Sequence, residues 1–233
     1  AAADELLLLT LNGQQYEAPP LNYSVRDQPT ILGLSPSSGP AAGGTAISLT
    51  LSSRAAAADH HCRFGGGGAL DDDVDVTAAD HANASNIVVC VSPPASEGGA
   101  SELAHSLNGQ QFGGPSVFTY YAPPQTDGAV PASGPRAGGT NVTVTGAGLG
   151  GAGSHVLCRF GEELINASRV DESTLRCFAP AAPGGAPAGD LARPLALTLN
   201  GQQFTEAAAD GAFVQYEPPQ ISTLYPVSGP ATG

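Results

Sequence analysis

The side chains that could do chemistry in this sequence begin with a short run of metal-ligand types, His60, His61 and Cys62. Imidazole nitrogens and thiolate sulfurs are ligands for soft metals such as Zn²⁺. The corresponding cysteine in the second half of the chain, Cys158, follows two aliphatic residues instead. Because one half lacks the histidines, a metal is not a requirement of the shared fold. We therefore expect no metal here.

The four cysteines fall into two pairs with similar surroundings, one pair in each half of the chain. We expect disulfides within each half, joining Cys62 to Cys90 and Cys158 to Cys177. By loop-closure entropy, each bridge would stabilise its half by roughly 3–4 kcal/mol.

A cluster of carboxylates, formed by Asp71, Asp72, Asp73 and Asp75, is the second candidate for metal binding. Ca²⁺ prefers several oxygen ligands, but the ligand spacing of an EF-hand is absent. The second half has only Glu162 and Glu163 at this place. The pattern favours a solvated acidic loop.

A glycine-rich segment at residues 146–151 fits the pattern Gly-X-Gly-X-X-Gly. In a dinucleotide site this pattern follows a strand and opens a helix. Here the next segment, residues 155–160, is predicted to be another short strand, so we expect a simple strand connection. The chain also shows no nucleophile elbow and no paired carboxylates. We therefore expect no active site, no enzymatic activity and no cofactor.

Four Asn-X-Ser/Thr sequons could carry N-linked glycans. They are at Asn22, Asn83, Asn141 and Asn166. Paired cysteines and sequons together favour an oxidising, secretory route and an extracellular or cell-surface location. Asn22 alternates with apolar residues on a strand, and Asn83 and Asn166 are predicted in polar loops between the cysteines. If the source is a green alga, O-linked sugar is also expected on the Pro/Gly/Ala-rich loop Ala179–Pro194.

Asn141 is the most informative sequon, because it lies in an alternating run. Val142 and Val144 are expected to point inward, which leaves Asn141 and Thr143 facing solvent.

The overall charge limits the partners. The formal net charge is −13, from 8 basic and 21 acidic residues. Such a surface repels a phosphate backbone, so nucleic acid is not an expected partner. The longest leucine run, Leu6–Leu9, is far too short to span a membrane.

One six-residue motif, Leu-Asn-Gly-Gln-Gln-aromatic, occurs three times, at Leu11–Tyr16, Leu107–Phe112 and Leu199–Phe204. An Asn-Gly pair between alternating runs predicts a β-hairpin with a two-residue turn. The copies are about 95 residues apart, a spacing that indicates whole domains and not small solenoid units.

The repeat gives the domain organisation. We expect the end of one repeat at residues 1–28, complete domains at 29–124 and 125–219, and the start of another repeat at 220–233. Many short alternating segments with 31 Gly and 20 Pro predict antiparallel β-sandwiches. Double prolines at 123–124 and 218–219 predict short, stiff joints and hence a rod of domains.

The order of motifs in both halves resembles a known family. Pro-X-Ser-Gly-Pro-X-X-Gly-Gly-Thr is followed by Cys-Arg-Phe-Gly, a second cysteine, the Asn-Gly motif and an aromatic strand ending in a double proline. This order resembles the IPT/TIG domain over nearly the whole chain. The resemblance implies an all-β fold of tandem immunoglobulin-like (E-set) sandwiches. Departures are the Cys177-Phe178-Ala179-Pro180 segment and the acidic insertion in the first half.

The family occurs in plexin-type receptor ectodomains, in large repeat proteins on the surfaces of algae and other protists, in starch-active enzymes and in Rel-type transcription factors. Three functions therefore compete: a structural or adhesive glycoprotein rod, a ligand-binding receptor ectodomain, and an accessory domain of a carbohydrate-active enzyme. We favour the first, in a large algal or protist extracellular protein.

The two ends of the chain suggest how such a rod would repeat. Leu7–Asn12 resembles Leu195–Asn200, and Ile221–Pro230 resembles Ile31–Pro40. We therefore expect a filament with a two-domain unit, whose partners are further repeats of the same chain or copies of itself, by strand donation in the second case.

Overall fold

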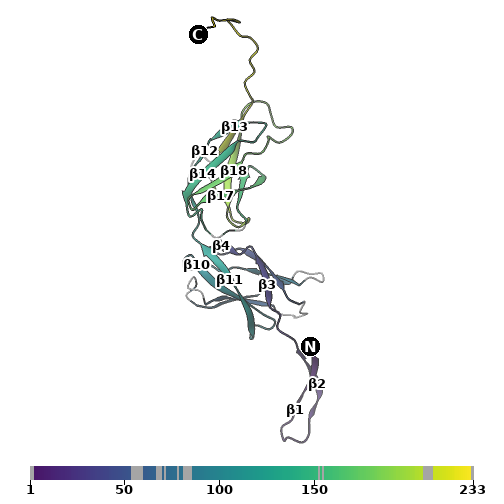
Figure 1. The fold of residues 1–233 in the computed structure, drawn as a ribbon. Helices are drawn as coiled ribbons and strands as arrows, with labels where there is room; N and C mark the ends of the chain where they lie inside the picture. The colour runs from purple at the N-terminus through teal and green to yellow at the C-terminus, as the bar shows by residue number, and fades with distance from the viewer. Residues whose placement is uncertain are drawn as a thin grey trace. The chain divides into compact units, whose positions relative to one another are not determined.

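A computed structural model of the chain describes residues 3–53, 60–66, 70, 72–77, 79–80, 86–151, 153, 155–206 and 212–231. Every regular element in these ranges is a β-strand, and the strands are numbered β1 to β21 (Figure 1). The chain divides into two compact units, Ala1–Ala122 and Pro123–Gly233. The predicted boundaries at 28/29 and 219/220 remain predictions.

The first unit begins with a separate two-stranded antiparallel sheet. It is formed by β1 (Ala3–Leu9) and β2 (Glu17–Val25), with Leu7 opposite Leu21. The leucines of β1 and the apolar residues of β2 that the structure describes are exposed to solvent.

The rest of the first unit is a sandwich of two sheets. One sheet has the order β3-β5-β9-β8 and the other β4-β11-β10-β6-β7. Their strands are β3 (Ile31–Ser35), β5 (Ala46–Leu51), β9 (Ile87–Val91), β8 (Ala79–Asp80), β4 (Ser38–Pro40), β11 (Phe112–Tyr121), β10 (Gly99–Ser106), β6 (His61–Gly65) and β7 (Val74–Thr77).

Alternating side chains fill the space between the two sheets. As predicted, Ile47, Leu49 and Leu51 of β5 point inward and are at most 1% exposed. They belong to one buried cluster with Phe64 and Phe118 of the facing sheet, whose rings meet edge to face. Burying side chains of this size stabilises a fold by about 1.5–3 kcal/mol each.

The second unit repeats this plan. One sheet has the order β12-β14-β18-β17, and the other β13-β21-β19-β15-β16, with β20 paired to β19. Their strands are β12 (Gln125–Val130), β14 (Asn141–Ala147), β18 (Thr174–Phe178), β17 (Ser168–Asp171), β13 (Ser133–Pro135), β21 (Ala212–Tyr216), β19 (Leu191–Thr198), β15 (Leu157–Phe160), β16 (Glu163–Asn166) and β20 (Thr205–Glu206). Val142 and Val144 are fully buried, as predicted.

The Ser-Gly-Pro motif forms a short strand that pairs in parallel with the last strand of each unit. β4 pairs with β11 and β13 with β21. A Cβ atom at Gly39 would collide with Thr45 Oγ1 and would lie 2.9 Å from Phe118 Cζ. The same holds at Gly134, against Thr140 and Phe213. This close approach explains why the middle residue of Ser-Gly-Pro is glycine, since the threonine of Gly-Gly-Thr packs directly against it.

The Asn-Gly hairpins differ from the prediction in their turn. Residues 107–111 separate β10 from β11, so the connection has five residues and not two. Asn108 Oδ1 accepts hydrogen bonds from the backbone N–H groups of Gln110 (3.0 Å) and Gln111 (3.2 Å), and its Nδ2 donates to Gln111 Oε1 (2.6 Å). Asn12 and Asn200 form the same three bonds. The asparagine side chain holds the loop, which a two-residue turn would not require.

Three further segments differ from the expectation. Asp75 lies in β7 and not in an acidic loop, because β7 pairs along β6. Asn166 is the last residue of β16, paired with Leu157, and is therefore not in a loop. The Pro/Gly/Ala loop, predicted to extend to Pro194, ends at Leu191, where β19 begins. Pro194 is therefore part of β19 and is paired with Ala212 of β21.

Candidate functional site

The cysteines lie at the centre of each sandwich. Cys62 on β6 is bonded to Cys90 on β9, and Cys158 on β15 is bonded to Cys177 on β18, with Cα atoms 6.3 Å apart in both pairs. All four side chains are fully buried. In each unit the bridge therefore joins one sheet to the other, in the pairing expected from the sequence.

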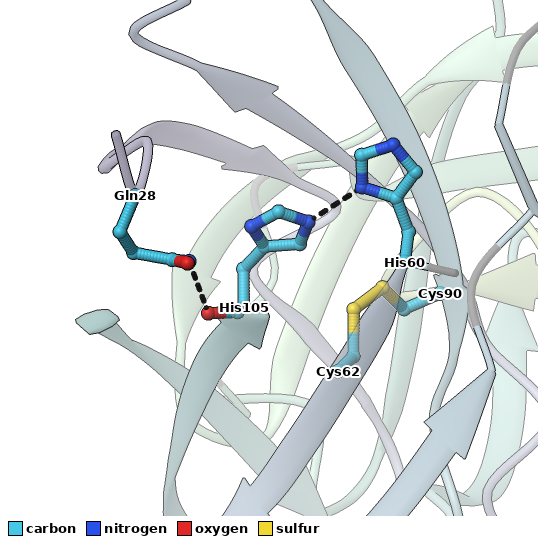
Figure 2. Close-up of a disulfide and its surroundings, with 5 residues drawn as sticks. All are labelled: Gln28, His60, Cys62, Cys90 and His105. Carbon is cyan, nitrogen blue, oxygen red and sulfur yellow. Dashed lines mark hydrogen bonds between the residues drawn. A yellow bond between two sulfur atoms is a disulfide. The ribbon is translucent and has the colours of Figure 1, made fainter. Parts of the chain in front are cut away.

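A buried pair of histidines lies beside the first disulfide (Figure 2). His60 Nδ1 and His105 Nε2 are 2.9 Å apart, and the two side chains are 4% and 0% exposed. Gln28 Nε2 donates a hydrogen bond of 2.8 Å to the His105 carbonyl oxygen. The pair thus forms inside the core of the first unit, at the junction of β6 and β10.

Neutral imidazoles can form only one hydrogen bond in this geometry. Among the described residues, His60 Nε2 and His105 Nδ1 are buried without a partner. Whichever ring donates, one N–H group and one lone pair remain unsatisfied, at a cost in stability. Burial, and secondly the charge of His60, lowers the pKa of His105 to about 4. His105 is therefore neutral at physiological pH.

The metal site considered from the sequence consisted of three consecutive residues, His60, His61 and Cys62, whereas the structure pairs His60 with His105. Cys62 is bonded to Cys90 and cannot be a thiolate ligand. No group of three His, Cys, Asp or Glu side chains in the described part of the chain is placed to hold a metal ion. The sequence analysis missed His105; its position in the inward alternation of β10, two residues after the buried Leu103, was the available signal.

Arginine and an aromatic ring link two of the sequence motifs. The Arg63 guanidinium carbon lies 3.8 Å from the centre of the Phe112 ring, and Arg159 lies 4.5 Å from that of Phe204. Cys-Arg-Phe and Leu-Asn-Gly-Gln-Gln-aromatic therefore meet in space in both units, which the sequence analysis did not anticipate.

Asp75 completes this contact in the first unit. Its two carboxylate oxygens accept hydrogen bonds from Arg63 Nε (2.8 Å) and Nη2 (3.2 Å). The bond to Arg63 lowers the pKa of Asp75, and the bond to Asp75 raises the pKa of Arg63. Asp75 is therefore an ion-pair partner, whereas Asp72 and Asp73 lie before β7 and Asp71 lies outside the described residues. The second-half carboxylates, Glu162 and Glu163, lie at the turn into β16.

The glycine-rich segment at 146–151 forms a closed turn. Gly146 and Ala147 end β14, and Leu149 is fully buried. Arg169 donates hydrogen bonds to the carbonyl oxygens of Leu149 and Gly151. The carbonyls face an arginine, and β15 follows, so the segment does not have the strand-to-helix form of a phosphate cradle.

The sequons lie at different places. Asn22, Asn141 and Asn166 are exposed on β2, β14 and β16, while Asn83 lies outside the described residues. Their occupancy by glycans remains a prediction, as does O-linked sugar on the loop after Ala179.

No helix long and apolar enough to cross a membrane occurs in the residues that the structure describes.

Comparison with known proteins shows which domains the chain resembles. Residues 124–207 match the family model "IPT/TIG domain". Over 206 residues, the chain is 28% identical to plexin-A2 of Mus musculus, a match that covers 85% of this chain and 10% of plexin-A2. The chain thus spans about a tenth of the length of that relative.

Among solved structures, the chain is similar to the full extracellular region of plexin A4. A structure of its domains 1 to 10 gives a TM-score of 0.53 at 21% identity and covers 85% of this chain and 16% of that one. A structure of domains 1 to 8 gives 0.46 at 21% identity, with 81% and 18% covered. The all-β, immunoglobulin-like fold predicted from the sequence is confirmed, and the match to the IPT/TIG family model lies in the second unit.

Proposed function

We propose that this chain is a segment of an extracellular or cell-surface protein in which tandem IPT/TIG-type domains act as structural spacers. One observation carries the proposal. In both units a fully buried disulfide joins the two sheets at the same place in the fold, opposite His105 in the first unit and Leu197 in the second. Disulfides of this kind form and persist in oxidising compartments outside the cytosol.

The distribution of polar groups supports a structural role without catalysis. The histidine pair is enclosed in a core, and Arg63 is engaged by both Asp75 and Phe112. Arg169 closes the glycine-rich turn. In each case the side chain that could have served chemistry is instead part of the framework. We therefore propose that the segment is not an enzyme and needs no cofactor.

The finer proposal is a filament of repeating two-domain units, in which partners are further repeats or copies of the same chain. The likeness of Leu7–Asn12 to Leu195–Asn200 supports it. The hairpin β1–β2 also supports it. Its pairing of Ala3 with Val25 resembles the pairing of Gly99 with Tyr120 in the hairpin β10–β11 of the first sandwich. N-linked glycans on exposed sequons would cover such a filament.

The second candidate is a ligand-binding receptor ectodomain. The similarity to plexin-A2 favours it, because the aligned region extends over 85% of the chain and so includes parts of both units. Such a receptor would bind a protein ligand through one of these domains and would signal through parts outside this segment.

Location and assembly distinguish these proposals. An antibody against this segment should label intact, non-permeabilised cells of the source, and the native protein should contain no free thiol. An intracellular protein with reduced cysteines would overturn the extracellular proposal. Electron microscopy of the native protein should show filaments with an axial repeat of two domains. Single particles that bind a soluble protein ligand would instead exclude the filament and favour the receptor.

A further inference from the structure

The exposed face of the sheet β12-β14-β18-β17 places a sequon beside an uncovered aromatic ring. Asn141 is the first residue of β14 and is paired with Phe178, the last residue of β18. Phe178 is 59% exposed, and the neighbouring Val142 and Cys177 are fully buried. Asn141 and Phe178 therefore point to the same, outer face.

The strand register brings the two side chains within reach of one another. Residues directly opposite in an antiparallel pair have Cβ atoms about 4.5–5.5 Å apart. The sequon threonine, Thr143, lies on the same face, opposite Arg176 on one side and Val130 on the other. β12 ends at Val130, so its ladder stops before it reaches Asn141. On the β12 side the strand ladder thus ends at Thr143, and on the β18 side the residue that faces Asn141 is Phe178.

We propose that Asn141 carries an N-linked glycan whose first N-acetylglucosamine packs its apolar C–H face on the Phe178 ring. The inference rests on the extracellular location proposed above, because it requires passage through the secretory route. The donor is a lipid diphosphate-linked oligosaccharide. The Asn141 amide nitrogen forms a bond to the sugar C1 carbon, the bond from C1 to the diphosphate oxygen breaks, and the amide proton leaves to the released diphosphate. No oxidation or reduction is involved.

Covering the exposed Phe178 ring with the sugar is energetically favourable. An aromatic side chain left in water on a strand exposes apolar surface, and covering this surface is favourable in proportion to the area removed from water. The flat faces of aromatic rings also give specific contacts with groups that carry partial positive charge, as sugar C–H groups do. A glycan at Asn141 would therefore stabilise the β14–β18 pair and would itself be held close to the sheet.

The other described sequons provide an internal comparison. Asn166 lies opposite Leu157, and Asn22 lies opposite Leu6. Neither has an aromatic ring in the facing position. The same sugar at those two sites would have no ring directly opposite to stack on, so among the sequons that the structure describes we expect this stabilisation at Asn141.

The first test is modification of the full 233-residue chain, secreted from cultured eukaryotic cells behind a signal peptide. Intact-glycopeptide mass spectrometry should show a glycan on Asn141, and Thr143→Val should abolish it while leaving the asparagine in place. A secreted, disulfide-bonded chain with unmodified Asn141 would overturn this inference and leave the proposed function standing. Free thiols in the native protein would overturn the proposed function instead.

The second test is the contact with the ring. The glycans are trimmed enzymatically to a single N-acetylglucosamine, and the thermal midpoint of the second unit is compared with that of Thr143→Val. We expect the sugar to raise the midpoint by about 4 °C, the order expected for a small gain in a domain of this size. The gain should vanish in Phe178→Ala and persist in Phe178→Tyr. Hydrogen exchange in β14 and β18 should slow only where the gain is present.

A spectroscopic measurement separates stacking from a general effect of the sugar. Protons of the first sugar at Asn141 should show upfield ring-current shifts that disappear in Phe178→Ala, while the sugar at Asn166 should show none. An equal gain in Phe178→Ala and the parent chain, or absent ring-current shifts, would overturn the stacking.

Discussion

The guanidinium carbon of Arg63 on β6 lies 3.8 Å from the centre of the Phe112 ring on β11. Strand β10 lies between these two strands in the sheet. The equivalent residues of the second unit, Arg159 and Phe204, are 4.5 Å apart. In both units the residue opposite the arginine on the intervening strand is alanine, Ala104 or Ala196. The contact therefore couples the Cys-Arg-Phe strand to the Asn-Gly hairpin across a small residue.

The first prediction concerns this contact. Phe112→Ala should lower the free energy of unfolding of the first unit by about 1 kcal/mol, because Arg63 loses the ring but keeps Asp75. Phe112→Trp should keep most of the stability. Urea unfolding followed by a probe in the first unit measures both, and an unchanged midpoint in Phe112→Ala would show that the ring contributes nothing.

The second prediction concerns pH and the histidine pair. The pKa of His105 is about 4 in the folded protein and has an ordinary value of 6.5. Because the unfolded chain binds a proton that the folded chain excludes, stability is full above about pH 6.5 and falls as the pH decreases toward 4. The loss from His105 alone should be at most roughly 3 kcal/mol.

The second unit supplies the control for this pH dependence. Leu197 occupies the position of His105, opposite Cys158 as His105 is opposite Cys62. His105→Leu should flatten the fall between pH 6.5 and 4 in the first unit, measured by chemical unfolding at each pH. An identical pH profile in this variant would contradict the role assigned to His105.

The third prediction concerns the disulfides. Replacing both Cys158 and Cys177 by alanine should destabilise the second unit by about 3 kcal/mol, because the unfolded chain regains the freedom of a 19-residue loop. Changing both residues avoids an unpaired thiol. Peptide mapping without reduction should recover the Cys62–Cys90 and Cys158–Cys177 pairs in the parent chain. A Cys62–Cys158 link would contradict the pairing.

The fourth prediction concerns the glycine of Ser-Gly-Pro. Gly39→Ala should cost about 2–3 kcal/mol, because its Cβ would collide with Thr45 and crowd Phe118 in a packed core. Gly33→Ala on the neighbouring β3 is the matched control, since nothing lies within 4 Å of its added Cβ. Thermal unfolding should separate the two variants clearly, and equal midpoints would contradict this account of the motif.

The sequence by itself determined the central strands β5 and β14 and their inward faces. Alternation in β5 and β14 identified Ile47, Leu49, Val142 and Val144, because period-2 patterning is local and one face must be buried. The repeated cysteines indicated one bridge in each unit, and the motif order indicated the immunoglobulin-like fold.

Only the tertiary structure decided which distant side chains meet. His60 and His105 are 45 residues apart in the chain, and β6 and β10 bring them together. The contact of Arg63 with Phe112 likewise depends on the sheet order, and the pairing of Asn141 with Phe178 depends on the β14–β18 register. Such neighbours follow from strand order and register, which are set by the packing of the whole sandwich and leave no local pattern in the sequence.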